Sequence, residues 1–356
     1  PYTFSTEPTA QIAFTEIFSG DESSPSHQIG PCQTVDDSLY VGVGDGEKAS
    51  KSRQLGSTLG KILRMSFDGN PIEANPFYDG ADSENPANYV WAYGLRNPFG
   101  LKAVGTRIFV ADNGRKIDRF LEIERGADYL WDGDEVSNGV NADAVFSPGF
   151  GVAQLNRYPE ESLLFPEQFR QSFFLAVTGN TQVTELEESR KQPPRILTFE
   201  YGIEQSRLLS VPTPIIRYRG DGIQMIVGAD FGPDGLYFVP LFPDPEGVST
   251  VLKLRYSPGD EHPFVLEEEA DPLQIMDELG CFGCHTLNNN QGGTIAPLLD
   301  RDQLVSRLTT KLNSAEYFQQ LADADLLEEE PFVSFVGARE VVRKAEGEEK
   351  IRAWIQ

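Results

Sequence analysis

Short apolar runs separated by turn residues fill the first 258 residues of this 356-residue chain. The runs are rich in β-branched and aromatic residues and are bounded by Gly, Pro, Asn and Asp, a pattern that predicts strands. The clearest lie at residues 38–43, 61–65, 107–111, 172–177, 235–239 and 251–255. A recurring group of about four short strands with an Asp-Gly turn is typical of a propeller blade. Residues 1–258 are therefore expected to form an all-β domain.

The strand pattern repeats about four times along this domain. The units are expected near residues 25–70, 85–132, 145–200 and 203–256. An unclosed propeller would leave a long strand edge unpaired. We therefore expect further blades upstream of residue 1.

A second constraint lies at residues 281–285, where the sequence reads C-x-x-C-H. This spacing is the attachment signature of a c-type haem. The thiols of Cys281 and Cys284 are expected to bind the haem covalently, and His285 is expected to be the proximal iron ligand. A zinc site would need further Cys or His residues nearby, and none follows residue 285 in the sequence.

The sequence pattern becomes helical after an acidic, proline-containing linker at residues 259–270. Residues 271–356 are expected to form a small all-α domain that resembles a class I cytochrome c. In that resemblance, the carbonyl of Pro297 would accept a hydrogen bond from the proximal histidine.

The sequence does not identify the sixth iron ligand. Class I cytochromes usually supply a distal Met from the second half of the domain, but no Met or His follows His285 here. The position could be vacant or filled by a Lys or Tyr. It could also be filled by His262 or Met276, or by a residue beyond Gln356. A vacant or weakly bound position would lower the potential and admit small ligands.

The formal net charge is −25, which argues against nucleic acid or an anionic membrane surface as a partner. No apolar run approaches the roughly 18 residues of a membrane span. Cys32 has no disulfide partner outside the haem motif and is expected to be a small buried side chain. Haem attachment to C-x-x-C-H takes place outside the bacterial cytoplasm, so we expect an exported precursor and a periplasmic or extracellular protein.

The segments at residues 26–30, 39–46, 60–69, 75–77 and 90–101 resemble, in order and spacing, the soluble glucose/sorbosone dehydrogenase family. These are six-bladed β-propellers that use pyrroloquinoline quinone (PQQ). The resemblance is strong over residues 26–131, weaker over 145–256, and does not reach the predicted cytochrome. It implies a six-bladed type of propeller that is incomplete here, with about four blades present.

By this resemblance, His27 matches the catalytic base and Asp45 the aspartate that orients it. Arg96 and Asn97 match residues that hold the quinone, with Arg96 next to its reactive oxygens. A carboxylate beside an imidazole fixes its tautomer, and a guanidinium stabilises charge that develops on a quinone.

The backbone carbonyls of Gly114 and Arg115 match the position where the family holds the Ca²⁺ that polarises the quinone. The chain departs from the family at residues 117–123, where its sequence differs from the acidic segment that the family has at this position. It departs again at 128–131, where Asp-Tyr-Leu-Trp replaces Asn-Tyr-Gly-Trp.

Together these features predict a quinohaemoprotein dehydrogenase. It would oxidise a sugar or related alcohol with PQQ and pass electrons to the covalent haem and then to another cytochrome or a copper protein. Two alternatives stay open: an electron-transfer cytochrome on a non-catalytic propeller scaffold, and a gas or redox sensor built on five-coordinate haem.

Overall fold

The computed structural model describes residues 15–256 except 21–23, 83, 135–140, 147–148, 167–168, 181–192, 211, 218–224, 243–246 and 248–250. The haem motif, the acidic linker at 259–270 and the predicted cytochrome domain at 271–356 lie outside the described residues. Within the described residues, the regular secondary structure consists of short β-strands and two single-turn 3₁₀ helices, η1 (Ala49–Lys51) and η2 (Pro86–Tyr89).

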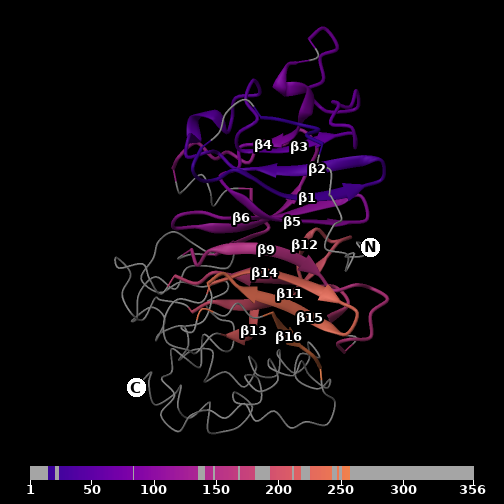
Figure 1. Cartoon of the computed structure of the whole chain (residues 1–356), viewed down its shortest axis with the longest axis vertical. Coiled ribbons are helices and arrows are strands. Elements are labelled where there is room, and N and C mark those ends of the chain that lie inside the picture. Colours follow the sequence, from indigo (N-terminus) through magenta and orange to yellow (C-terminus); the bar gives the residue numbers. More distant parts are fainter. Residues whose placement is uncertain are drawn as a thin grey trace.

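The strands form four antiparallel sheets (Figure 1). The first sheet contains β1 (Ile29–Val35), β2 (Ser38–Val43), β3 (Lys61–Met65) and β4 (Val90–Tyr93). The second contains β5 (Pro98–Val104), β6 (Arg107–Asp112), β7 (Asp118–Ile123) and β8 (Ala144–Phe146). The third contains β9 (Val152–Arg157), β10 (Ser172–Val177), β11 (Arg195–Gly202), β12 (Arg207–Leu208) and β13 (Thr213–Arg217). The fourth contains β14 (Ile226–Gly232), β15 (Gly235–Pro240) and β16 (Leu252–Leu254).

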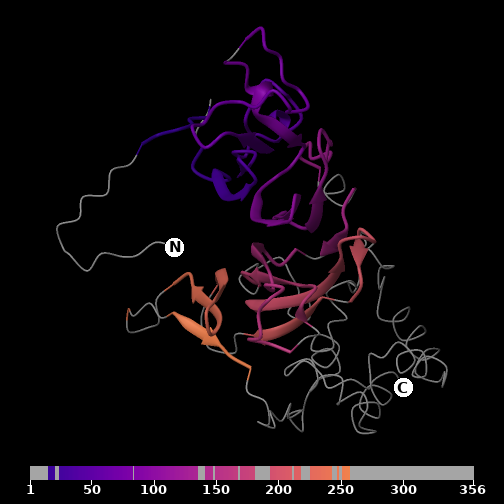
Figure 2. The same ribbon diagram turned by 90° about the vertical axis from the view of Figure 1, so that its right-hand side faces the viewer.

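Each sheet follows chain order from one edge to the other, with β12 and β13 both paired to β11 in the third. The first strands of successive sheets contact one another: β1 packs on β5, β5 on β9 and β9 on β14. Figure 2 shows the four sheets following one another along an arc. This is the arrangement of propeller blades around an axis, with the first strand of each blade innermost.

The cores between blades follow from the two-residue period of the strands. On β6, Ile108 and Val110 face the first blade, whereas Phe109 and Ala111 face the third. The core between the second and third blades is aromatic. Phe109 and Phe173 have ring centroids 4.9 Å apart. Because both faces of the middle blades are buried, their strands read as continuous apolar runs rather than as alternating ones.

Most of the strand predictions are confirmed, including residues 38–43, 61–65 and 172–177. The described residues form four sheets, which matches the predicted number of units, but the unit boundaries are wrong. The strands β4, β8, β12 and β13 each belong to the blade before the one predicted. Residues 90–93 were assigned to the second unit, yet β4 pairs with β3 as the last strand of the first blade. The long connection over residues 66–89 resembles a boundary between blades, but it lies inside one.

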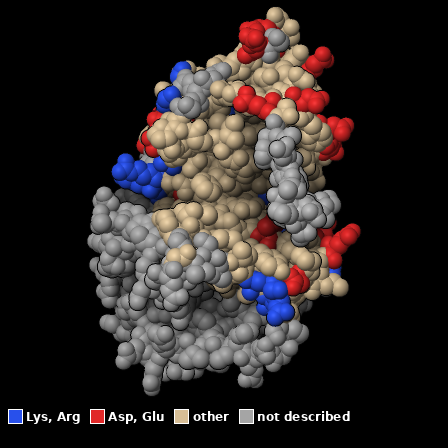
Figure 3. Space-filling model, in the orientation of Figure 1, with Lys and Arg blue, Asp and Glu red and all other residues tan. Residues whose placement is uncertain are grey.

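Acidic side chains gather over the first blade, at the top of Figure 3, in keeping with the net charge of −25. Among the described residues, no helix is long and apolar enough to cross a membrane. The prediction for Cys32 is wrong, because this residue on β1 is exposed. As the first strand of its blade, β1 has the burial pattern of an edge, and most of its residues are only partly covered.

Candidate active site

A histidine–aspartate pair lies where the segment before β1 meets the loop after β2. The Nδ1 atom of His27 is 2.6 Å from Oδ1 of Asp45. The same oxygen accepts the backbone N–H of Glu47 at 2.9 Å, and Oδ2 accepts the indole N–H of Trp131 at 2.8 Å. Burial by itself raises the pKa of Asp45, but the hydrogen bonds from His27, Trp131 and Glu47 outweigh it and lower the pKa. Asp45 is therefore held as a carboxylate.

A close approach of two backbone segments creates this pair. The amide of Gly46 donates to the carbonyl of His27 at 3.2 Å. A Cβ at Gly44 would lie 2.5 Å from that same carbonyl oxygen, so only glycine permits the approach. His27 itself has a φ of 51°, in the left-handed region that non-glycine residues rarely adopt. Such backbone strain is often found at functional sites.

The turn between β4 and β5 brings the backbone of Arg96 into contact with Asp45. The carbonyl of Arg96 accepts the N–H of Asp45 at 2.7 Å. The Arg96 Nη1 atom donates to the carbonyl of Asn113 at 2.7 Å, and the guanidinium carbon lies 5.8 Å from the centre of the Trp131 ring. The neighbouring Asn97 is tied to Asn113, whose N–H donates to the Asn97 carbonyl at 2.9 Å. The side chains of Arg96 and Asn97 are both only partly buried.

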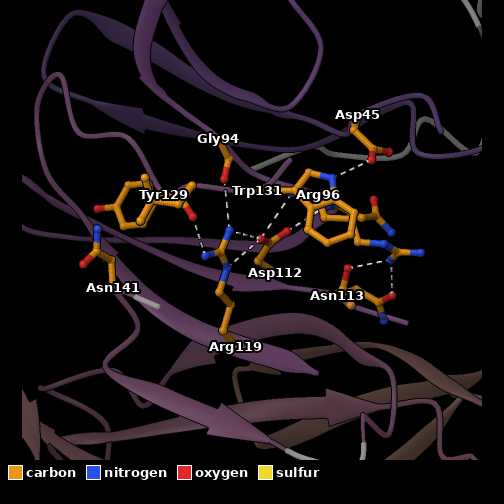
Figure 4. A network of polar contacts seen from close by, with 12 residues as sticks. Asp45, Gly94, Arg96, Asp112, Asn113, Arg119, Tyr129, Trp131 and Asn141 are labelled. Carbon is orange, nitrogen blue, oxygen red and sulfur yellow. Dashed lines mark hydrogen bonds and ion pairs between the residues drawn. The ribbon is translucent and has the colours of Figure 1, made fainter. Parts of the chain in front are cut away.

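A fully buried ion pair holds these segments together (Figure 4). Arg119 Nε donates to Oδ2 of Asp112 at 2.9 Å, and both side chains have no solvent exposure. Arg119 also donates to the carbonyls of Tyr129 at 2.7 Å and Gly94 at 3.1 Å. Asp112 Oδ2 additionally accepts the N–H of Arg96 at 3.3 Å. The pair thus connects β6, β7, the turn before β5 and the segment that carries Trp131.

Lys61, at the start of β3, fixes the loop that follows Asp45. Its side chain is fully buried, and Nζ donates to the carbonyls of Lys51 at 3.1 Å, Ser52 at 2.8 Å and Leu59 at 2.5 Å. These acceptors match the three N–H groups of an ammonium. Burial lowers the pKa of Lys61 to about 7.

The loop after β6 contains the predicted calcium carbonyls of Gly114 and Arg115. The N–H of Gly114 donates to Oδ1 of Asp118 at 2.8 Å, and Oδ2 accepts the N–H groups of Phe150 and Gly151, each at 2.8 Å. Burial raises the pKa of Asp118 to about 6 despite these donors. Within the described ranges, no cluster of three or more His, Cys, Asp or Glu could hold a metal. A calcium ion here would thus depend on backbone carbonyls, and it stays a prediction.

The structure brings His27, Asp45 and Arg96 together, with Asn97 and the segment containing Gly114 and Arg115 alongside. The roles of all six residues stay predictions, and Cys281, Cys284 and His285 lie outside the described residues. Sequence reasoning missed the ion pair and the indole contact, that is, Asp112, Arg119 and Trp131. The available signal was weak: two oppositely charged residues, Asp118 and Arg119, begin β7 although every residue of that strand except Glu122 is buried.

Comparisons with known proteins agree with this fold. Residues 4–164 match the family model "Glucose / Sorbosone dehydrogenase". A search of curated proteins gives no significant match. A solved glucose dehydrogenase has a TM-score of 0.52 at 20% identity, covering 68% of each chain. The PQQ-bound aldose sugar dehydrogenase of Streptomyces coelicolor has a TM-score of 0.51 at 22% identity, covering 67% of this chain and 65% of that one.

A Thermus thermophilus protein described as a "putative oxidoreductase (glucose dehydrogenase)" has a TM-score of 0.50 at 22% identity, covering 67% of this chain and 68% of that one. These matches each cover about two thirds of this chain and about two thirds of the other protein. The described part of the chain has the propeller-type fold of the glucose and aldose sugar dehydrogenases.

Proposed function

We propose that the protein is a PQQ-dependent oxidoreductase that oxidises the C1 hydroxyl of an aldose or a related alcohol. The observation that carries the proposal is the His27–Asp45 pair beside Arg96, in a fold shared with sugar dehydrogenases. The family match over residues 4–164 includes all three residues.

The residues of the site fit a quinone that carries carboxylates. The guanidinium of Arg96 is held in place by Asn113 and by the face of Trp131, and it is only partly buried. Arg96 and the amide of Asn97 would hold the quinone, since a preorganised cation and amide favour an oxygen that gains negative charge. When bound, PQQ supplies an acceptor for the hydride, that is, for both electrons of the C1–H bond.

His27 would take the proton of the substrate hydroxyl. Because Asp45 is held as a carboxylate and lies 2.6 Å from Nδ1, it accepts a hydrogen bond there and leaves the lone pair on Nε2. Nε2 is thus the atom that can accept the hydroxyl proton while hydride leaves C1. The aldose loses two electrons and two hydrogen nuclei overall and becomes a lactone.

The proposed function also includes a covalent haem that would receive the electrons from the quinone. Cys281 and Cys284 would hold a covalent haem with His285 as its proximal ligand, and this group would supply a one-electron carrier between the propeller and an external cytochrome or copper protein. Fusion to the propeller raises the effective concentration of this acceptor. The attachment chemistry supports an exported, periplasmic or extracellular protein.

The test uses the full chain, expressed with haem maturation and reconstituted with PQQ and Ca²⁺. Stopped-flow absorbance should show haem reduction on addition of an aldose, and an artificial dye should report turnover. A His27→Asn variant should bind PQQ but lose turnover. If no aldose reduces either haem or dye, the dehydrogenase proposal fails. If haem is present and His27→Asn changes nothing, the propeller is a docking scaffold for the cytochrome.

A further inference from the structure

We propose that Trp131 is a positioning residue that fixes the Asp45 carboxylate, which orients His27, and the guanidinium of Arg96, which would hold the quinone, relative to each other. The inference rests on the proposed function, because it assigns a task within that site. Trp131 contacts both groups from one side chain, through its indole N–H and through its ring face (Figure 4).

The N–H contact fixes the rotation of the Asp45 carboxylate. Oδ1 receives His27 and the amide of Glu47, and Oδ2 receives the indole N–H at 2.8 Å. Asp45 has 2% exposure, so little solvent can replace that donor. Without the indole N–H, one oxygen would lack the donor described here, and the carboxylate could turn away from His27. A buried acceptor without a partner is unfavourable, so such a rotation is expected.

The ring face of Trp131 holds the second group, the guanidinium of Arg96. The guanidinium carbon of Arg96 lies 5.8 Å from the ring centre, within the range of a cation–π contact. Trp131 has 5% exposure, which places this contact in a largely desolvated setting. Asn113 holds Nη1 of Arg96 from another direction, through its carbonyl at 2.7 Å. The guanidinium is therefore held by an aromatic face and by a carbonyl, and its orientation depends on both contacts.

The backbone around Trp131 is itself held firmly enough for this task. Its N–H donates to the carbonyl of Gly94 at 2.9 Å, and Arg119 donates to that same carbonyl. The preceding Leu130 has a φ of 67°, and its N–H is held by Oδ1 of Asp128 at 2.9 Å. The indole thus projects from a segment tied to the turn that also carries Arg96.

Two substitutions separate the two contacts. Trp131→Phe removes the N–H and keeps an aromatic face, whereas Trp131→Leu removes both. Trp91→Phe is the matched control, because the buried indole nitrogen of Trp91 has no hydrogen-bond partner among the described residues. We expect Trp131→Phe to lower kcat about tenfold with the sugar KM unchanged. We expect Trp131→Leu to weaken PQQ binding about fivefold as well, through loss of the ring face.

A second measurement needs neither PQQ nor sugar. The chain has 3 tryptophans, so the indole signal of Trp131 can be assigned in a ¹H–¹⁵N spectrum of the full protein by its absence in Trp131→Phe. Asp45→Asn should move this signal and leave that of Trp91 in place. An unmoved Trp131 signal, or a Trp131→Phe enzyme with the kcat of Trp91→Phe, would overturn the inference. A wild type that binds PQQ but turns over no aldose would instead overturn the proposed function alone.

Discussion

Replacing Arg119 by Met should destabilise the propeller strongly, because it breaks the buried ion pair without creating a large cavity. The carboxylate of Asp112 would stay in a site with no solvent exposure and lose its cation. The carbonyls of Gly94 and Tyr129 would each lose a donor. Breaking a buried pair in this way costs about 3–5 kcal/mol. For a domain of this size, that cost lowers the melting temperature on the order of 10 °C.

Urea unfolding followed by tryptophan fluorescence measures the effect, in a Trp354→Phe background so that Trp91 and Trp131 report on the propeller. The double variant Asp112→Asn/Arg119→Met should be less destabilised than the sum of the two single variants by about 2 kcal/mol or more, since it leaves no unpaired buried charge.

Lys253→Met provides the matched control. Lys253 Nζ also lies close to a carboxylate, 2.6 Å from Oδ2 of Asp234, but this pair is exposed. Exposed pairs contribute little, so the urea midpoint should hardly move. An Arg119→Met protein that loses less than about 1 kcal/mol, or that matches Lys253→Met, would show that the ion pair does not hold the site segments together.

Three further predictions concern the site, its loop and the haem. His27→Asn should lower kcat at least about 100-fold in the dye assay while the circular dichroism spectrum stays the same; a smaller loss would mean that another group takes the proton. The folded-state pKa of Lys61 is lowered to about 7, so the unfolded chain binds more protons between pH 7 and 10. Wild-type stability relative to Lys61→Met should therefore rise by about 1.4 kcal/mol per pH unit in that window, measured by urea unfolding; a flat difference would show that the three carbonyls keep the ammonium charged. Cys281→Ser/Cys284→Ser should abolish haem staining of the denatured protein, and retained staining would refute covalent attachment through this motif.

The sequence predicted the strands of the propeller better than the limits of its blades. A strand such as residues 172–177 is marked by its own composition, so local reasoning locates it. The membership of β4 depends on its pairing with β3 across the connection at residues 66–89. That pairing is a long-range contact, and no local pattern reveals it.

The residues of the candidate site also fall into two groups, those that local sequence motifs predict and those that depend on long-range pairing. His27, Asp45 and Arg96 were predicted from the order of motifs along the chain. Asp112 and Arg119 face each other because β6 and β7 pair in a register that places them directly opposite. The register follows from the turn between these strands, which contains the predicted calcium loop. An error of one residue would move Arg119 to the other face of its sheet, so the ion pair could be predicted only once the register was known.

The turn that carries Arg96 and Asn97 also joins two blades. At this point the chain leaves β4, the last strand of one blade, and enters β5, the first strand of the next. The residues proposed to hold the quinone are therefore the same residues that connect the first blade to the second. A circular permutation that opens the chain in the long connection before β4 would leave this joint intact, whereas one that opens it at residues 94–97 would disconnect neighbouring blades and dismantle the site together.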